Sequence, residues 1–213
     1  MSQLKLVLGD RNLSSWSLRP WLAMRVAGLD FEEIDIALDG PDTADMIAKY
    51  SPSGLVPCLV DGDLAFWDSL AICEYAAELA PEARLWPTDP KARAIARSVS
   101  AEMHSGFAEV RKVWPMNMVR EGLALPCRGR LKREVTRIAH LWTDCRERFG
   151  DGGPFLFGQF SIADAMFAPI VSRFKTYGPF ELPQEAEAYM NAVWALPAYA
   201  EWRAKAQAEV SAL

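Results

Sequence analysis

The segment "LKLVLGDRNLSSWSLRPWLAMRVAGLDFEEIDIAL", residues 4–38, changes its hydrophobic period twice and decides the fold. Its first part, "LKLVL", is a short apolar run that predicts a buried strand. "SLRPWLAMRVAG" has helical spacing and ends at Gly28, a residue typical of helix C-termini. "EEIDIAL" then alternates, with Ile34, Ile36 and Leu38 on one face, and this predicts a second strand.

The residues that follow extend this strand, helix, strand unit. "TADMIAKY" predicts a short helix stopped by "SPSG", and "LVPCLV" and "LAFW" predict two strands joined by a "DG" turn. The helix "SLAICEYAAELA" completes residues 1–80 in the order βαβαββα. Residues 81–90, "PEARLWPTDP", contain three prolines and no sustained period, which is typical of a linker.

The remaining residues, 91–213, have a helical pattern throughout. "SIADAMFAPIVSRFKTYG" predicts one helix, and two shorter helices end the chain. Two apolar stripes predict further helices: Ile95, Val99, Met103, Phe107, Val110 and Trp114; and Leu131, Val135, Ile138, Trp142, Cys145 and Phe149. We therefore expect a small α/β domain followed by an all-α domain.

Composition restricts the kinds of ligand and location. The 213 residues are 51% hydrophobic, enough for a large core, and the net charge of -5 argues against a nucleic-acid or anionic-membrane partner. The four cysteines form no C-x-x-C pair and the chain has two histidines, so we expect free thiols and no metal site. Without a signal-like or long apolar segment, we expect a cytoplasmic protein.

Two dipeptides allow both a structural and a functional interpretation. Val56-Pro57 could simply open a strand, or Pro57 could be cis and turn the backbone of Val56 outward to pair with an extended peptide ligand. Asp68 and Ser69 precede an apolar helix, where either is a good N-cap. The same helix N-terminus, with a hydroxyl and a carboxylate, would also suit the zwitterionic head of an amino acid.

The serine-rich segment "NLSSWSLRP", residues 12–20, raises the same question. We expect Ser17 or Trp16 to cap the helix, with Pro20 in the first helical turn. A cap leaves Ser14 and Ser15 unexplained, and both would lie near the positive end of the helix, where an anion is stabilised. No histidine occurs in the first 100 residues, so a serine here is better suited to donate a hydrogen bond than to attack.

Two features of the helical part of the chain remain, and only the first is mainly structural. "SIAD", Ser161 to Asp164, has the S-x-x-D pattern of a capping box. His104 lies among tryptophan and methionine residues, in "MHSGF" and "VWPMNM", which could belong to the core or line a pocket.

Taken in this order, "SSWSLRP", "GLVPCLVDG", "WDSLAICEYAAE", a linker and "GQFSIADAMFAP" resemble the cytosolic glutathione transferases over nearly the whole chain. The closest pattern is that of a serine-type, zeta- or theta-like bacterial member. The resemblance implies a thioredoxin-like N-terminal domain and an all-helical C-terminal domain. It also implies glutathione as co-substrate, no metal and a homodimer.

The resemblance also assigns roles to residues. Ser14 or Ser15 matches the catalytic serine, and Arg19 a structural arginine. Val56, beside cis Pro57, matches the residue whose backbone pairs with the cysteinyl part of glutathione. Asp68 and Ser69 match the residues that hold the γ-glutamyl end.

Two positions depart from the family pattern. Trp16 stands where zeta members have cysteine, which weakens an assignment as a maleylacetoacetate isomerase. Leu55 stands where many members have a lysine or glutamine that contacts the glycine carboxylate of glutathione. The pocket for the second substrate is expected from the following residues: Trp16, the helix from His104 to Arg111, Trp114 and Met116.

The implied activity is transfer of glutathione to small hydrophobic electrophiles. A glutathione-dependent isomerase or peroxidase would use the same thiolate with a different pocket. A non-catalytic relative that binds ligands or proteins is a third interpretation. The presence of Ser14, Ser15, Val56, Pro57 and Ser69 favours an enzyme.

Overall fold

The N-terminal domain contains one four-stranded mixed sheet with the strand order β2-β1-β3-β4. The computed structural model describes residues 3–212. β1 is parallel to β2, with Val7 opposite Ile34, and antiparallel to β3, with Val7 opposite Cys58. The strands are β1 Leu4–Gly9, β2 Phe31–Ile36, β3 Cys58–Asp61 and β4 Leu64–Trp67.

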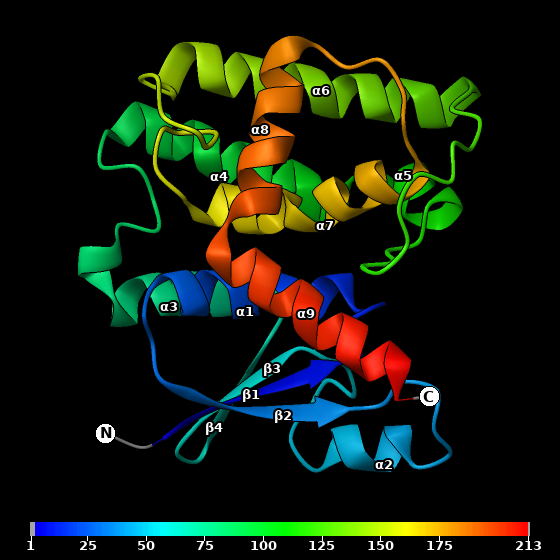
Figure 1. Cartoon of the computed structure of the whole chain (residues 1–213). Helices are drawn as coiled ribbons and strands as arrows, with labels where there is room; N and C mark the ends of the chain where they lie inside the picture. The colour runs from blue at the N-terminus through cyan, green and yellow to red at the C-terminus, as the bar shows by residue number, and fades with distance from the viewer. Residues whose placement is uncertain (1–2, 213) are drawn as a thin grey trace.

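Three helices surround this sheet, and the predicted order βαβαββα is confirmed. They are α1 Ser15–Val26, α2 Thr43–Ala48 and α3 Ser69–Leu79. Figure 1 shows α1 and α3 between the sheet and the C-terminal helices, with α2 beyond the sheet on the other side. The first domain is thus thioredoxin-like, and α1 carries the serine segment at the junction of the two domains.

The C-terminal domain is helical, as predicted. After a short 3₁₀ turn at Pro81–Ala83, its helices are α4 Pro90–Ser105, α5 Ala108–Val113, α6 Gly129–Phe149, α7 Ile162–Tyr177, α8 Gln184–Ala195 and α9 Pro197–Ser211. α7 lies centrally and nearly all its residues are buried. In Figure 1, α9 leaves α8 and crosses α1 toward the N-terminal sheet.

The apolar stripe from Ile95 to Trp114 lies on two helices rather than one. α4 ends at Ser105, and Phe107 adopts a left-handed conformation with φ 54° before α5 begins. A Cβ at Gly106 would lie 2.7 Å from the Glu102 carbonyl oxygen, so this turn requires glycine. Residues 114–128, which include two prolines, are also non-helical.

The predicted start of α1 was wrong. Ser14 is the N-cap, not Ser17 or Trp16, and its Oγ accepts a hydrogen bond from the Ser17 amide. Pro20 therefore lies inside the helix rather than in its first turn. The Ser17 hydroxyl is already used by β1, because its Oγ accepts a hydrogen bond from the Gly9 amide at 3.0 Å.

Among residues 3–212, no helix is both long and apolar enough to cross a membrane. All four cysteines are free, and Cys58, Cys73 and Cys145 are buried. Within the same described range, no group of three or more histidine, cysteine, aspartate or glutamate residues is arranged to hold a metal ion.

Candidate functional site

The two adjacent serines at the start of α1 have different hydrogen-bond partners. The Ser14 hydroxyl donates to Ser17 Oγ at 2.8 Å while it accepts from the Ser17 amide, so both of its functions are engaged within the helix cap. Ser15 is the first residue of α1, and its Oγ accepts a hydrogen bond from Arg173 Nη2 at 3.4 Å. Nowhere in residues 3–212 does the Ser15 hydroxyl have an acceptor for its own proton.

Arg173, from the middle of α7, lies behind Ser15. Its Nε donates to the Trp114 carbonyl at 2.8 Å and its Nη1 to the Pro169 carbonyl at 3.1 Å. The side chain is buried, and burial together with the charge of Arg111 lowers the pKa of Arg173 to about 10. The described part of the chain offers it no carboxylate within ion-pair distance.

The backbone at Val56 is available for pairing. The Val56–Pro57 peptide bond is cis, as the functional interpretation of this dipeptide expected. Val56 comes just before β3 begins at Cys58. Its amide and carbonyl groups make no hydrogen bond to another backbone group of residues 3–212, so an extended ligand could pair with them.

Asp68 and Ser69 lie together at the N-terminus of α3. Asp68 Oδ1 caps the helix by accepting from the amides of Leu70 and Ala71. Its Oδ2 lies 3.0 Å from Nε2 of His104 on α4, which links the two domains. Ser69 is buried, and its Oγ has no partner among the described residues. A buried hydroxyl without a partner at a helix N-terminus is suited to an anionic ligand group.

Trp16 lies beside two arginines and a histidine. Its ring lies 4.3 Å from the guanidinium carbon of Arg19, 5.5 Å from that of Arg111, and edge-on to His104. Arg19 is buried, and its Nε and Nη1 have no partner in the described range. Burial, followed by the charges of Arg111 and Arg173, lowers the pKa of Arg19 to about 9.

The structure brings Trp16, His104 and Arg111 together, but Trp114 and Met116 lie in the core. Trp114 is completely buried and stacks on Tyr177 and Phe180. Met116 is also buried. Trp114 therefore reaches the site through its carbonyl group, which holds Arg173, rather than through its ring.

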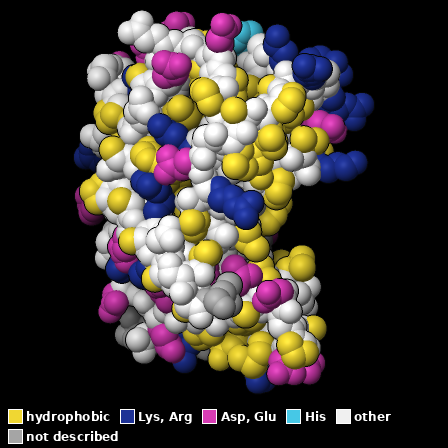
Figure 2. All heavy atoms as spheres, turned by 45° about the vertical axis from the view of Figure 1, so that its right-hand side comes forward, with side chains coloured by type: hydrophobic (Ala, Val, Ile, Leu, Met, Phe, Trp, Pro, Cys, Tyr) yellow, Lys and Arg dark blue, Asp and Glu magenta, His cyan; other side chains and the backbone are white. Residues whose placement is uncertain are grey.

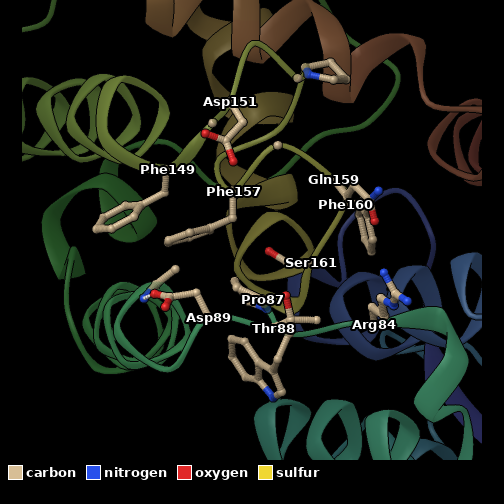
Figure 3. A pocket seen from close by; sticks show the side chains of 16 residues that line it. Arg84, Pro87, Thr88, Asp89, Phe149, Asp151, Phe157, Gln159, Phe160 and Ser161 are labelled. Atoms are coloured by element: carbon tan, nitrogen blue, oxygen red, sulfur yellow. Dashed lines mark hydrogen bonds between the residues drawn. The ribbon is translucent and has the colours of Figure 1, made fainter.

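Figure 2 shows a notch in the outline of the molecule between the helical part above and the sheet-containing part below. Away from this notch, a pocket of about 510 Å³ lies between the linker and the segment that joins α6 to α7. In Figure 3, Phe149 and Phe157 lie side by side, with Asp151 above them and Asp89 below. None of the predicted site residues lines this pocket.

Comparison with known proteins matches both domains. Residues 13–79 match the family "Glutathione S-transferase, N-terminal domain", and residues 128–207 match "Glutathione S-transferase, C-terminal domain". Glutathione S-transferase Z1 of Arabidopsis thaliana is 31% identical over 163 residues, which is 73% of this chain and 71% of that protein. The chain belongs to the glutathione S-transferase family.

Other members of the family are similar over varying lengths. Glutathione S-transferase Z2 of Arabidopsis thaliana is 29% identical over 90% of this chain and 92% of its own length. Maleylacetoacetate isomerase of Rattus norvegicus is 31% identical over 54% of each chain. The theta class glutathione S-transferase of Xanthomonas axonopodis pv. citri, solved with glutathione bound, has a TM-score of 0.66, with 27% identity over 94% of this chain and 97% of its own.

In this glutathione S-transferase family member, the side chains of Glu209 and Asn12 help to hold the loop before Ser14. The Glu209 carboxylate on α9 accepts from the amides of Arg11 and Asn12, at 2.8 and 3.2 Å. Asn12 Oδ1 accepts from the Met118 amide at 2.8 Å. Glu209 and Asn12 were not found from the sequence, because no motif or periodic spacing marks them. Arg173 was also missed, although one feature of the sequence could have drawn attention to it: Arg173 is a lone charge inside the apolar run "APIVSRF".

Proposed function

We propose that this protein binds glutathione and transfers its thiolate to small hydrophobic electrophiles, with the Ser15 hydroxyl donating a hydrogen bond to the sulfur. The observation that carries the proposal is the state of the Ser15 hydroxyl. It lies at the N-terminus of α1, accepts from Arg173, and has an uncommitted proton within the described part of the chain. The protein would thus be a serine-type enzyme.

The energy needed for this activation is within reach of these groups. A thiol of pKa about 8.5 is mostly protonated at neutral pH, and the thiolate is the nucleophile. Lowering that pKa by about two units requires about 2.7 kcal/mol of differential stabilisation. A hydroxyl donating to an anion contributes about 1.5 to 3 kcal/mol, and a helix N-terminus about 0.3 to 1 kcal/mol more. No general base is needed.

The rest of glutathione would extend from Ser15 across the N-terminal domain. We propose that the backbone of Val56, next to Pro57, pairs with its cysteinyl part. The γ-glutamyl carboxylate would be held by Ser69 and the first amides of α3, and its ammonium group by Asp68. The buried and unpaired Ser69 hydroxyl supports this assignment.

The electrophile would bind on the other side of the sulfur. Trp16, His104 and Arg111 supply an aromatic surface with positive charge around it. Trp114 would affect this pocket only indirectly, through its carbonyl group, which holds Arg173.

Replacing the serines one at a time tests the proposal. We expect Ser15→Ala to lower turnover of an electrophilic test substrate about tenfold to a hundredfold, because a charge-assisted hydrogen bond is lost. Glutathione affinity, measured by calorimetry, should stay close to that of the wild type. Ser14→Ala is the matched control, since it removes a helix cap and should cost about 1 kcal/mol of stability with turnover retained. Wild-type turnover in Ser15→Ala would reject the assignment.

Ser69→Ala tests the γ-glutamyl site separately. Its first effect should be a weaker affinity for glutathione, because the hydroxyl contacts the ligand in the ground state as well as during the reaction. A calorimetric titration that gives wild-type affinity would count against this role.

An isomerase is the second candidate, because the chain is similar to a protein named maleylacetoacetate isomerase. This activity would use the same thiolate but would require the pocket to accept a maleyl-type acid. Trp16, which stands in place of a cysteine, favours the transferase. Turnover of a maleyl-type acid above that of simple electrophiles would favour the isomerase instead.

We propose that the chain is divided into two domains and a linker, with the bounds expected from the sequence. Residues 1–80 form the glutathione-binding domain, 81–90 the linker and 91–213 the helical domain that contributes the pocket. A homodimer in the cytoplasm completes the proposal. Light scattering after size-exclusion chromatography should give twice the mass of one chain, and a monomeric mass would contradict the dimer.

A further inference from the structure

Arg173 is a buried cation without a compensating anion. Its three hydrogen bonds go to the Trp114 carbonyl, the Pro169 carbonyl and Ser15 Oγ, all of them neutral groups. None of the carboxylates in residues 3–212 forms an ion pair with it. Burying an uncompensated charge is costly, and a well-packed apolar residue would avoid that cost. Stability alone therefore does not explain why a charged side chain occupies position 173.

The guanidinium is fixed independently of Ser15. Two of its three partners are backbone carbonyls, one on its own helix and one at the end of α5. The third bond, from Nη2 to Ser15 Oγ, spans 158 residues of sequence and joins the two domains. Arg173 thus presents a positively charged N–H to the serine from a rigid frame.

This contact changes what the Ser15 hydroxyl can do. An N–H that donates into the oxygen occupies a lone pair, so the proton of the hydroxyl points toward another acceptor. A charged donor also polarises the O–H bond and strengthens the hydrogen bond that the hydroxyl gives in turn. An anion that accepts this bond would be stabilised by both groups in series.

We propose that Arg173 is a positioning residue that acts through Ser15 to stabilise the glutathione thiolate. This inference rests on the proposed function of Ser15. The charged or titratable groups near Arg173 are Arg111 on α5, Tyr177 on α7 and Tyr199 on α9, and Arg19 on α1 feels its charge. None of these supplies a carboxylate that would cancel the effect of Arg173 on the thiolate.

The test measures the pKa of the thiol of bound glutathione, from thiolate absorbance and from the pH profile of kcat/KM. We expect Arg173→Gln to raise this pKa by about one unit, which lowers kcat/KM about tenfold at pH values below it. Glutathione affinity at acidic pH, where the thiol is protonated in both proteins, should stay near the wild type. Arg173→Lys keeps the charge but not the three-way geometry, and should restore part of the loss.

A double-mutant cycle with Ser15→Ala separates this role from a merely structural one. If Arg173 acts through Ser15, Arg173→Gln should have little further effect on the thiol pKa in the Ser15→Ala protein. Equal effects in both backgrounds would overturn the inference. Arg146→Gln is the matched control, because Arg146 also holds two carbonyls, those of Gly153 and Pro154, away from the site. It should lower stability without moving the thiol pKa.

Three further outcomes are informative. If Arg173→Gln does not fold, Arg173→Lys alone serves as the test. Its single ammonium group cannot reproduce the three fixed hydrogen bonds, so the thiol pKa should still rise in this variant. An unchanged thiol pKa in Arg173→Lys would overturn the inference. If the wild type itself gives no thiolate signal with glutathione, the proposed function fails. If the wild type gives the signal and the Arg173 variants keep its pKa, only the present inference fails.

Discussion

Removal of the Asp164 carboxylate should strongly destabilise the C-terminal domain. Asp164 is completely buried at the start of α7. Its Oδ1 accepts from the Leu156 amide at 3.1 Å, and its Oδ2 accepts from the Ser161 amide at 2.7 Å and the Ser161 hydroxyl at 2.9 Å. This confirms the predicted capping box and adds the Leu156 amide, from the segment before α7.

Asp164→Ala leaves three buried donors without acceptors. Each unsatisfied group costs about 1 to 3 kcal/mol, or about 6 kcal/mol for the three. Removal of a poorly solvated carboxylate offsets part of this, because burial raises the pKa of Asp164 to about 6. With about 1.4 kcal/mol for each pKa unit above the usual value, the offset is about 3 kcal/mol and the net loss about 3 kcal/mol.

Urea unfolding followed by circular dichroism measures this loss. With a slope of about 2 to 3 kcal/mol per molar urea, the midpoint should fall by about 1 to 1.5 M. Asp144→Ala is the matched control, because Asp144 is exposed on α6 and only pairs with Arg148 one turn away. A midpoint for Asp164→Ala no lower than that of the control would refute the reasoning.

Asp164→Asn should remove a dependence of stability on pH. Because the pKa of Asp164 is raised in the folded protein, the folded state binds more protons than the unfolded state between pH 4 and about 6. The stabilisation from this proton is complete below the unfolded pKa and is lost as the pH rises through the folded pKa. The free energy of unfolding of the wild type, relative to Asp164→Asn, should therefore fall over this interval.

Three smaller changes probe the cap of α7, the loop before Ser14 and the proposed glutathione site. Ser161→Ala should cost about 1 to 2 kcal/mol in urea unfolding and leave turnover unchanged, since it affects only the helix start. Glu209→Ala removes the acceptor for the amides of Arg11 and Asn12. We expect a lower kcat with little change in the far-UV circular dichroism spectrum, and an unchanged kcat would contradict a role of Glu209 in holding the loop before Ser14. Leu55→Lys places a cation on an exposed position before Val56 and should tighten glutathione binding in calorimetry, least at high salt.

The order of elements in the N-terminal domain could be predicted because its signals are local. The strands differ from the helices in period, and turns such as "DG" lie between them. The cap of α1 could not be chosen in this way. Ser14, Ser15 and Ser17 are equivalent cap candidates in sequence, and the choice depends on the Gly9 amide of β1, which occupies Ser17.

Sequence suggested residues of the proposed site only where they lie in short motifs. Val56, Asp68 and Ser69 each lie at a helix or strand start, so their positions follow from the element order. Arg173 and Glu209 depend on partners 158 and 198 residues away, and no periodicity brings such pairs together. Trp114 was expected in a pocket, but a large aromatic ring satisfies the pattern of a core residue equally well.

The contact between α9 and the loop before Ser14 has a consequence for biosynthesis. Trp202 Nε1 donates to the Arg11 carbonyl, and Glu209 accepts the next amides, so the loop before Ser14 obtains its final hydrogen bonds from residues made almost 200 positions later. A thioredoxin-like domain emerging from the ribosome can form its sheet early. The loop before Ser14 can reach its final conformation only after α9 has been translated, so a nascent chain that stops short of α9 would be folded in part, with this loop not yet held in place.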